Sequence, residues 1–456
     1  MTNIQKLPWY TKLAFGAGDM GPAIATQING FFLLNFLINV AGLNPGAAGT
    51  LLLVVKVWDA VNDPLVGWLT DKTLSRWGRR RPWILFGAIP FGLAFFFHWL
   101  VPPFGEAGKF WYYLIMALLL DTAFTVVNVP YTALTAELTP DYDERTSLNS
   151  FRFSFSILSG VGSAFFHTQI LNAFKNDPLT GNAVSVGIWA LVSVLGFLAT
   201  FAGVREPETK MAKKEDEAGF LDGIRIALTN RPFVLVTLIY LSTWLTMQFI
   251  QNNLFIYTRD WLGLDTGLFG FLLLGIQVSA FIWVLIWGKV SERIGKKNVF
   301  YIGGVIFIAS LLGLFFVQRE QVTQVFVLGI IAGAGLGVGY LIPWSMLPDV
   351  IELDELETGQ RREGVFYGFF VFLQKMGLSL GLFISGWVLD LAGYIKAVPG
   401  GADPIQPESV LLALRWLVGP VGVVILLLGF VATYLYPITK EKHAEILAQL
   451  KAKRGG

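Results

Sequence analysis

Long apolar stretches alternate with short polar connections along almost the whole chain. A helix of roughly 20 apolar residues crosses the hydrocarbon core of a bilayer, so each such stretch is a candidate transmembrane span. We identify twelve, at residues 13–39, 49–70, 82–101, 110–134, 147–170, 184–203, 233–257, 267–288, 298–317, 323–344, 365–391 and 410–436. The pattern therefore predicts an all-α integral membrane protein with twelve transmembrane helices.

The longest polar stretch, residues 204–232, separates the sixth predicted span from the seventh. It contains a charge run at 210–217, followed by an amphipathic pattern around 219–229 that is compatible with a short helix on the membrane surface. We therefore expect an N-terminal half of six helices at 1–203 and a cytoplasmic linker at 204–232. A C-terminal half at 233–436 and a cytoplasmic tail at 437–456 complete the predicted organisation.

Charged residues make up 14% of the chain, well below the roughly 25% typical of soluble domains. Their positions set the orientation. Lys and Arg gather in the loops 71–81, 204–232 and 289–297 and in the tail after 437, whereas the opposite loops hold at most one each. Because basic loops stay in the cytoplasm, both termini are expected there, with the protein multi-pass in the plasma (inner) membrane. The chain has no Cys, which excludes disulfides and thiolate metal sites.

The two halves repeat one local pattern after their second span. A glycine is followed four positions later by an acid, and then by bases: Gly67, Asp71 and Arg76 in the first half, and Gly288, Glu292 and Arg293 in the second. The matched order predicts a parallel internal repeat, and hence pseudo-symmetric halves. It also predicts a cytoplasmic charge clamp between the halves, although positive-inside topology alone is the simpler interpretation.

Two carboxylates lie inside the second predicted span. Asp59 and Asp63 are four residues apart, so they share one helix face with Asn62. A carboxylate at the bilayer centre costs roughly 2.5–3.5 kcal/mol, which favours a functional role. We predict a sodium site at Asp59 and Asp63. Proton coupling is a rival, because neighbouring carboxylates without a cation repel, and a structural ion pair with Lys56 is the third interpretation.

Other polar residues interrupt later spans. Arg152 and Lys375 are bases that need partners from other helices, and Asp19 in the first span is a candidate partner for Arg152. Gln251 and Asn252 in the seventh span carry amides that hydrogen-bond sugar hydroxyls or, more commonly, neighbouring helices.

Five strings carry a resemblance to a known family: residues 12–16, the WDAVNDP segment at 58–64, and residues 129–134, 343–350 and 374–375. Together with the basic loop motifs, they resemble the glycoside–pentoside–hexuronide:cation symporter branch of the major facilitator superfamily. That branch includes the melibiose permease, and the sodium-dependent lysophosphatidylcholine symporters are related to it. The resemblance covers nearly the whole chain and implies alternating access by two six-helix halves.

The resemblance also implies roles for individual residues. It completes the cation site (Asp59, Asn62, Asp63) with Thr125 and with Asn128, which replaces a family Asp. Ala23 and Thr132 stand where melibiose-type relatives have a sugar-binding Asp and a stacking Trp. The substrate candidates are Arg152, Lys375, Asp19, Tyr131, Thr132, Gln251, Asn252 and Trp344.

The sequence thus predicts a cation-coupled symporter, sodium preferred, for a sugar or glycoside. A sodium-dependent lysophospholipid symporter is the first alternative, supported by the missing sugar-binding acids and the 38 Phe residues. An uncoupled lipid scramblase or a non-transporting membrane protein is the second. The chain has no P-loop or HExxH motif, so we expect no enzyme activity and no cofactor beyond sodium or a proton. The expected partners are substrate, cation and membrane lipid, without nucleic acid, and the expected state is a monomer.

Overall fold

The computed structural model describes residues 7–73, 75–139, 142–206, 220–319, 321–360, 362–397 and 404–454. Within these residues every regular element is a helix. The charge run at 210–217 lies outside them. The prediction of an all-α chain is therefore confirmed.

The chain divides into two compact units. Unit 1 comprises residues 1–213, 265–273 and 386–407, and unit 2 comprises residues 214–264, 274–385 and 408–456. The first boundary falls inside the predicted linker. The two shorter segments of unit 1 are the start of α10 and the end of α13 with the residues that follow it, both from the predicted C-terminal half.

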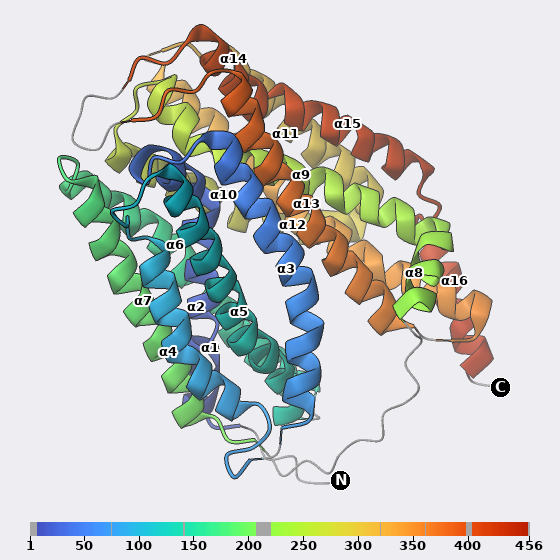
Figure 1. The fold of residues 1–456 in the computed structure, drawn as a ribbon. Helices are drawn as coiled ribbons and strands as arrows, with labels where there is room; N and C mark the ends of the chain where they lie inside the picture. Colours follow the sequence, from blue (N-terminus) through green and yellow to red (C-terminus); the bar gives the residue numbers. More distant parts are fainter. Residues whose placement is uncertain are drawn as a thin grey trace. The chain divides into compact units, whose positions relative to one another are not determined.

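Unit 1 is built mainly from the first seven helices (Figure 1). They are α1 (Trp9–Ala17), α2 (Met20–Ile28), α3 (Pro45–Asp71), α4 (Arg81–His98), α5 (Glu106–Leu138), α6 (Tyr142–Ala173) and α7 (Pro178–Gly203). α4 packs against α5 and α7, α3 against α5, and α6 against α1 and α2. This packing brings the acidic face of α3 onto α5.

The first predicted span is a broken helix rather than a continuous one. α1 ends at Ala17, α2 begins at Met20, and two π-helical segments, Asn29–Leu33 and Phe36–Val40, follow. At the break, a Cβ on Gly18 would lie 2.5 Å from the side chains of Tyr131 and Thr200, so a close approach requires glycine there. The break leaves Asp19 at the N-cap of α2.

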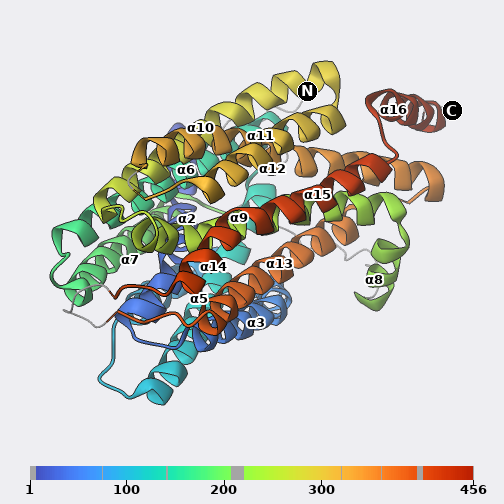
Figure 2. The same ribbon diagram turned by 90° about the horizontal axis from the view of Figure 1, so that it is seen from above.

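Unit 2 contains the remaining helices, apart from the start of α10 and the end of α13 (Figure 2). They are α8 (Phe220–Thr229), α9 (Arg231–Asp260), α10 (Thr266–Ile294), α11 (Lys296–Phe316), α12 (Val322–Thr358), α13 (Glu363–Leu391), α14 (Glu408–Val418), α15 (Pro420–Leu435) and α16 (Lys440–Arg454). α9 packs against α12, α14 and α15, and α11 packs against α12. The expected surface helix near 219–229 is α8.

Two features at the end of the chain differ from the sequence prediction. The last predicted span is divided into α14 and α15 at Gly419, because Pro420 has no N–H to continue the first helix. The tail forms α16, which no pattern indicated in advance. Ile446 and Leu450 of α16 are buried in the apolar core of unit 2, so tertiary packing holds this polar helix in place.

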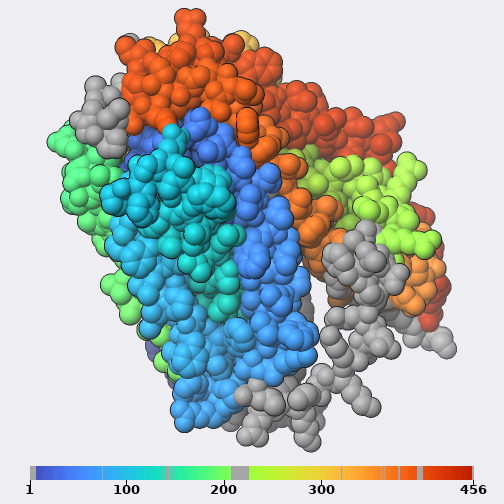
Figure 3. Space-filling view, in the orientation of Figure 1, coloured from blue at the N-terminus to red at the C-terminus, as the bar shows by residue number. Residues whose placement is uncertain are grey.

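Nine helices in the described part of the chain are long and apolar enough to cross a membrane. The broken first element, α3 and α6 are the predicted spans missing from this set, and α3 is missing because its intramembrane charges lower its hydropathy. The count of twelve therefore stays a prediction. The faces of α4 and α5, blue to cyan in Figure 3, carry exposed apolar side chains such as Phe86, Ile89 and Leu119, as lipid contact requires.

The internal repeat is visible in local geometry. Gly78 and Gly295 occupy matched positions after the second span of each half, and both have positive φ, 101° and 83°. The base that follows each glycine forms an ion pair with an acid on the fourth predicted span of its half, which is α5 in the first half and α12 in the second. Arg79 lies 2.6 Å from Glu137 of α5, and Lys296 lies 2.7 Å from Asp349 of α12. The same turn and the same kind of ion pair thus occur in both halves.

Gly78 also leaves room for the side-chain carboxylate of Glu206, which binds to the backbone that follows. The backbone N–H groups of Arg79, Arg80 and Arg81 donate to Glu206 at 2.5, 2.8 and 2.6 Å. A Cβ on Gly78 would lie 2.6 Å from that carboxyl group. Glycine is required here both for the backbone conformation and for the space.

We predict that Gly78→Ala lowers the melting temperature of the purified protein more than Gly263→Ala does. Both positions have positive φ, a conformation that costs a non-glycine residue about 1–3 kcal/mol. A Cβ on Gly263 would meet no atom within 4 Å, whereas one on Gly78 would meet the Glu206 carboxylate. Equal losses in a thermal melt in detergent would contradict a structural role for the Glu206 contact.

Candidate cation and substrate site

The polar residues of α3 and α5 meet in one group, here called the α3–α5 polar cluster: Lys56, Asp59, Asn62, Asp63, Asp121 and Thr125. The Thr125 hydroxyl donates to Asp63 Oδ1 at 2.9 Å, across 62 positions of sequence. One turn away, Trp58 Nε1 donates to Thr122 Oγ1 at 2.9 Å. These bonds connect the two helices and place Thr125 beside Asp63.

Lys56 lies between two carboxylates. Its Nζ is 3.5 Å from Asp59 Oδ2 on the same helix and 3.5 Å from Asp121 Oδ1 on α5. Sequence reasoning included the first pair as one interpretation but left Asp121 out of the site. The spacing of residues along the chain cannot show which helices are in contact, so the Lys56–Asp121 pair is known only from the structure.

Burial gives the cluster its electrostatic character. Asp59 is 4% exposed, Asn62 2% and Thr125 1%. Three carboxylates and one ammonium give the cluster a formal charge of −2. Asn62 Nδ2 is buried and has no hydrogen-bond partner among the described residues. A buried group of oxygen ligands with excess negative charge suits a small hard cation.

Asn128 lies close to one turn beyond Thr125 on α5 and is half-buried. It stands where the resemblance places an aspartate, so it offers an amide oxygen without charge. The negative charge of the cluster is therefore carried by Asp59, Asp63 and Asp121.

A second charged pair in unit 1 joins α2 to α6. Arg152 Nε lies 3.1 Å from Asp19 Oδ1, so the pairing proposed from sequence is present. The Arg152 guanidinium also lies 5.4 Å from the ring centroid of Tyr131. The hydroxyl of Tyr131 donates to the Phe15 carbonyl at 2.8 Å, and that of Thr132 donates to the Val129 carbonyl at 2.9 Å. These two hydroxyls therefore already donate to backbone carbonyls.

The remaining substrate candidates belong to unit 2. Gln251 and Asn252 lie on α9, with Asn252 2% exposed and its Nδ2 lacking a hydrogen-bond partner in the described part of the chain. Lys375 is half-buried on α13. Trp344 on α12 is half-buried among other aromatic rings. Three helices of unit 2 thus supply amide, ammonium and indole groups.

We call the aromatic side chains around Trp344 the aromatic row: Tyr240, Trp244, Tyr340, Trp344, Tyr367 and Phe370. Trp344 lies 5.2 Å from Phe370 and 6.4 Å from Tyr367 by ring centroid, and Trp244 lies 6.4 Å from Tyr340. Tyr340 is 44% exposed and Tyr367 36%, so the row combines a packed side with an accessible one. Sequence reasoning found Trp344 but missed the row, because α9, α12 and α13 supply it jointly.

The proposed clamp residues make contacts within their own units. Asp71 pairs with Arg80 at 2.5 Å, and Arg76 lies 4.6 Å from the Trp77 ring centroid. A Cβ on Gly288 would meet no atom within 4 Å, and one on Gly67 would meet Val129 at 3.9 Å. The carbonyls of Glu292 and Arg293 accept from Lys440 Nζ at 2.6 and 3.5 Å. The clamp between halves stays a prediction.

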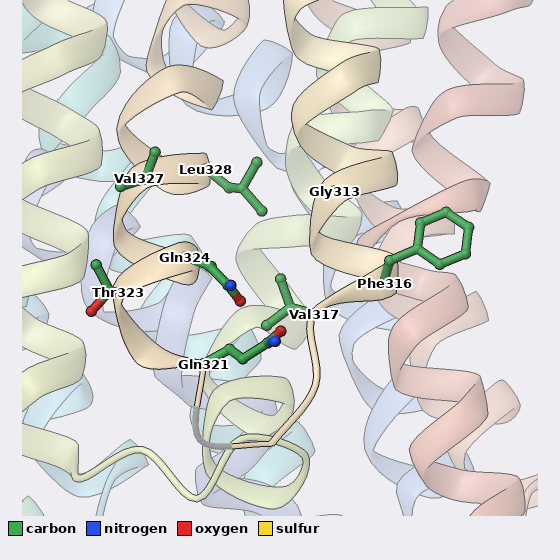
Figure 4. A pocket seen from close by; sticks show the side chains of 8 residues that line it. All are labelled: Gly313, Phe316, Val317, Gln321, Thr323, Gln324, Val327 and Leu328. Atoms are coloured by element: carbon green, nitrogen blue, oxygen red, sulfur yellow. The ribbon is translucent and has the colours of Figure 1, made fainter.

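A surface pocket of about 390 Å³ lies at the turn between α11 and α12 (Figure 4). Its lining is Gly313, Phe316, Val317, Gln321, Thr323, Gln324, Val327 and Leu328. It contains no ionisable side chain and none of the candidate residues. The chemistry of this pocket therefore gives no support for ion binding there.

Long apolar helices, acids within them and the repeated turn at Gly78 and Gly295 are typical of a secondary transporter. The chain matches the family model described as MFS/sugar transport protein over residues 14–440, and it belongs to that family. The family assignment confirms the resemblance found in the loop motifs and the WDAVNDP segment. It identifies a transporter embedded in a membrane by several spans.

Two relatives and one solved structure show the extent of the similarity. An uncharacterized symporter of Synechocystis is 36% identical over 99% of this chain and 98% of its own. The sodium-dependent lysophosphatidylcholine symporter 1-A of Danio rerio is 32% identical over 95% of this chain and 86% of its own. A bacterial homolog of the human lysosomal transporter Spinster shares the fold, with a TM-score of 0.70 at 13% identity over 96% and 97% of the two chains. The chain is a secondary symporter of the major facilitator type.

Proposed function

We propose that this symporter is coupled to sodium and that the ion binds in the α3–α5 polar cluster. The observation that carries the proposal is the contact of Asp63 with Thr125, with Asp59 and Asn62 buried on the same helix face. Carboxylate, amide and hydroxyl oxygens from two helices supply the ligand types that a hard cation prefers. Sodium binding between α3 and α5 couples ion occupancy to the packing of these helices.

We further propose that the substrate carries an anionic group and an apolar tail, as a lysophospholipid does. The aromatic row offers accessible ring surface, and Lys375 supplies a base in the same unit. The positions that bind and stack sugar in melibiose-type relatives are Ala23, Asn128 and Thr132, and the Thr132 hydroxyl donates to its own helix. Lysophosphatidylcholine, for which the Danio rerio relative is named, belongs to the same chemical class.

A glycoside is the second candidate substrate. The family description names sugar transport, and the buried amide of Asn252 has an Nδ2 without a partner among the described residues, a suitable donor to a hydroxyl group. The side chain of Gln251 lies one position away on α9. Such a glycoside would need to be anionic to use Arg152 or Lys375, which disfavours a neutral galactoside.

We place the protein in the plasma (inner) membrane as a monomer with cytoplasmic termini. The basic loops at 71–81 and 289–297 support this orientation. A reporter that is active in the cytoplasm alone is expected to work when it is fused at either end. Activity at one end and not at the other would contradict the even number of spans.

Asp59→Asn and Asp63→Asn are each expected to abolish sodium-dependent uptake while the protein still inserts into the membrane. The amide keeps the shape of the side chain and removes the charge that attracts the ion. Uptake into proteoliposomes with an inward sodium gradient measures the loss. Asp177→Asn is the matched control, because Asp177 caps α7 at an exposed loop and Asn caps helices equally well.

Sodium-stimulated uptake that survives in both variants would refute the site. A wild type that ignores sodium but follows a pH gradient would select proton coupling. Lipid flux that needs neither gradient would indicate a scramblase.

Lys375→Ala is expected to weaken binding of an anionic lysophospholipid about tenfold or more while sodium binding changes little. Loss of one charge-assisted contact, about 1.5–3 kcal/mol, accounts for that size. Tryptophan fluorescence of purified protein titrated with lysophosphatidylcholine, lysophosphatidylglycerol, phenyl glucuronide and melibiose measures the affinities. Lys442→Ala, in the exposed part of α16, is the control. Robust melibiose transport by the wild type, or unchanged lysolipid affinity in Lys375→Ala, would contradict the substrate assignment.

A further inference from the structure

We propose that Lys56 is a tethered counter-ion that competes with the coupling ion for Asp59, and that Asp121 receives Lys56 when the ion binds. The inference rests on the proposed sodium site and goes beyond it. It assigns to Lys56 and Asp121 a role in setting the affinity for the ion, although neither coordinates it. Both are therefore positioning residues.

The geometry of Lys56 supports an exchange between two partners. Its Nζ lies 3.5 Å from a carboxylate oxygen on each side, whereas a charge-assisted bond is normally about 2.7–2.9 Å long. The ammonium is therefore placed between Asp59 and Asp121 without a short bond to either. Four flexible side-chain carbons allow it to approach either carboxylate by small rotations.

The charges explain why such an exchange helps ion binding. When Lys56 interacts with Asp59, that carboxylate is partly neutralised and attracts sodium less strongly. When sodium occupies Asp59 and Asp63, Lys56 still has Asp121, which is 8% exposed on the adjacent helix. A lysine displaced without a receiving carboxylate would leave an uncompensated charge at membrane depth, which is costly. Asp121 removes this cost, so sodium binds more tightly than it would without Asp121.

A fixed structural ion pair is the competing explanation. In that case Lys56 would simply hold α3 to α5 at all times, and its removal would loosen the site and weaken sodium binding. The exchange predicts the opposite sign, because removal of a competitor frees Asp59. The sign of the change in affinity therefore separates the two explanations.

The test measures binding of sodium itself, so it does not depend on the identity of the substrate. Isothermal titration of the purified full chain with NaCl, in choline chloride, gives the Kd of the wild type and of each variant. Lys56→Met is expected to tighten binding about fivefold, equivalent to roughly 1 kcal/mol. Asp121→Asn is expected to weaken it about fivefold. Lys56→Arg keeps the charge and is expected to stay within about twofold of the wild type.

The double variant decides whether Asp121 acts through Lys56. Without the lysine, the Asp121→Asn change should have little effect, so the double variant should match Lys56→Met. Equal weakening by Asp121→Asn in both backgrounds would show a simple electrostatic field and overturn the exchange, as would unchanged or weaker binding in Lys56→Met. Lys56→Gln gives the same test if Lys56→Met does not fold. A wild type that binds no sodium would overturn the proposed function and this inference together.

Discussion

Each charge that this protein keeps inside an apolar helix has to be compensated by another group, since bulk water is not there to solvate it. In unit 1, Asp19 is compensated by Arg152, and Lys56 is shared by Asp59 and Asp121. Asp63 receives a hydroxyl from Thr125. The α3–α5 polar cluster holds three carboxylates and one ammonium, and this composition supports the proposal of a cation site there.

Charges at the polar ends of the helices are also compensated, but by a repeated turn with an ion pair. There the loops after the second span of each half use a glycine with positive φ and a base paired to the fourth helix. The two bases are partly exposed, at 31% of each side chain, whereas Glu137 and Asp349 are only 12% and 7% exposed. Each ion pair therefore offsets the desolvation of a buried acid. The same turn and the same kind of ion pair recur in both halves. The internal repeat is therefore preserved in backbone conformation and charge pairing, although the residues differ.

Most of the helices could be predicted from the length of the apolar stretches. In lipid, backbone N–H and C=O groups have no water to bond, so an apolar stretch that crosses the membrane has few alternatives to a helix. The sequence pattern also placed Asp59, Asn62 and Asp63 on one face, since a four-residue spacing settles that locally. The break at Gly18, the division at Gly419 and the docking of α16 could not be read in the same way. Each depends on contacts with residues far away in sequence, such as Tyr131 and Thr200 beside Gly18. Asp121 was left out of the predicted site for the same reason.

A site with excess negative charge must also avoid binding the ion too tightly to release it. In the proposed exchange, the Lys56 ammonium competes with sodium for Asp59. It therefore lowers the affinity of the carboxylates for sodium but can be displaced when the ion binds. The four flexible carbons of the lysine side chain let the ammonium move between the two carboxylates by small rotations. The partly exposed position of Lys56, at 26%, leaves it room to move, while Asp59 and Asp121 remain buried. At the proposed site, reversible ion binding thus depends on the same charge compensation that a helix with intramembrane acids requires.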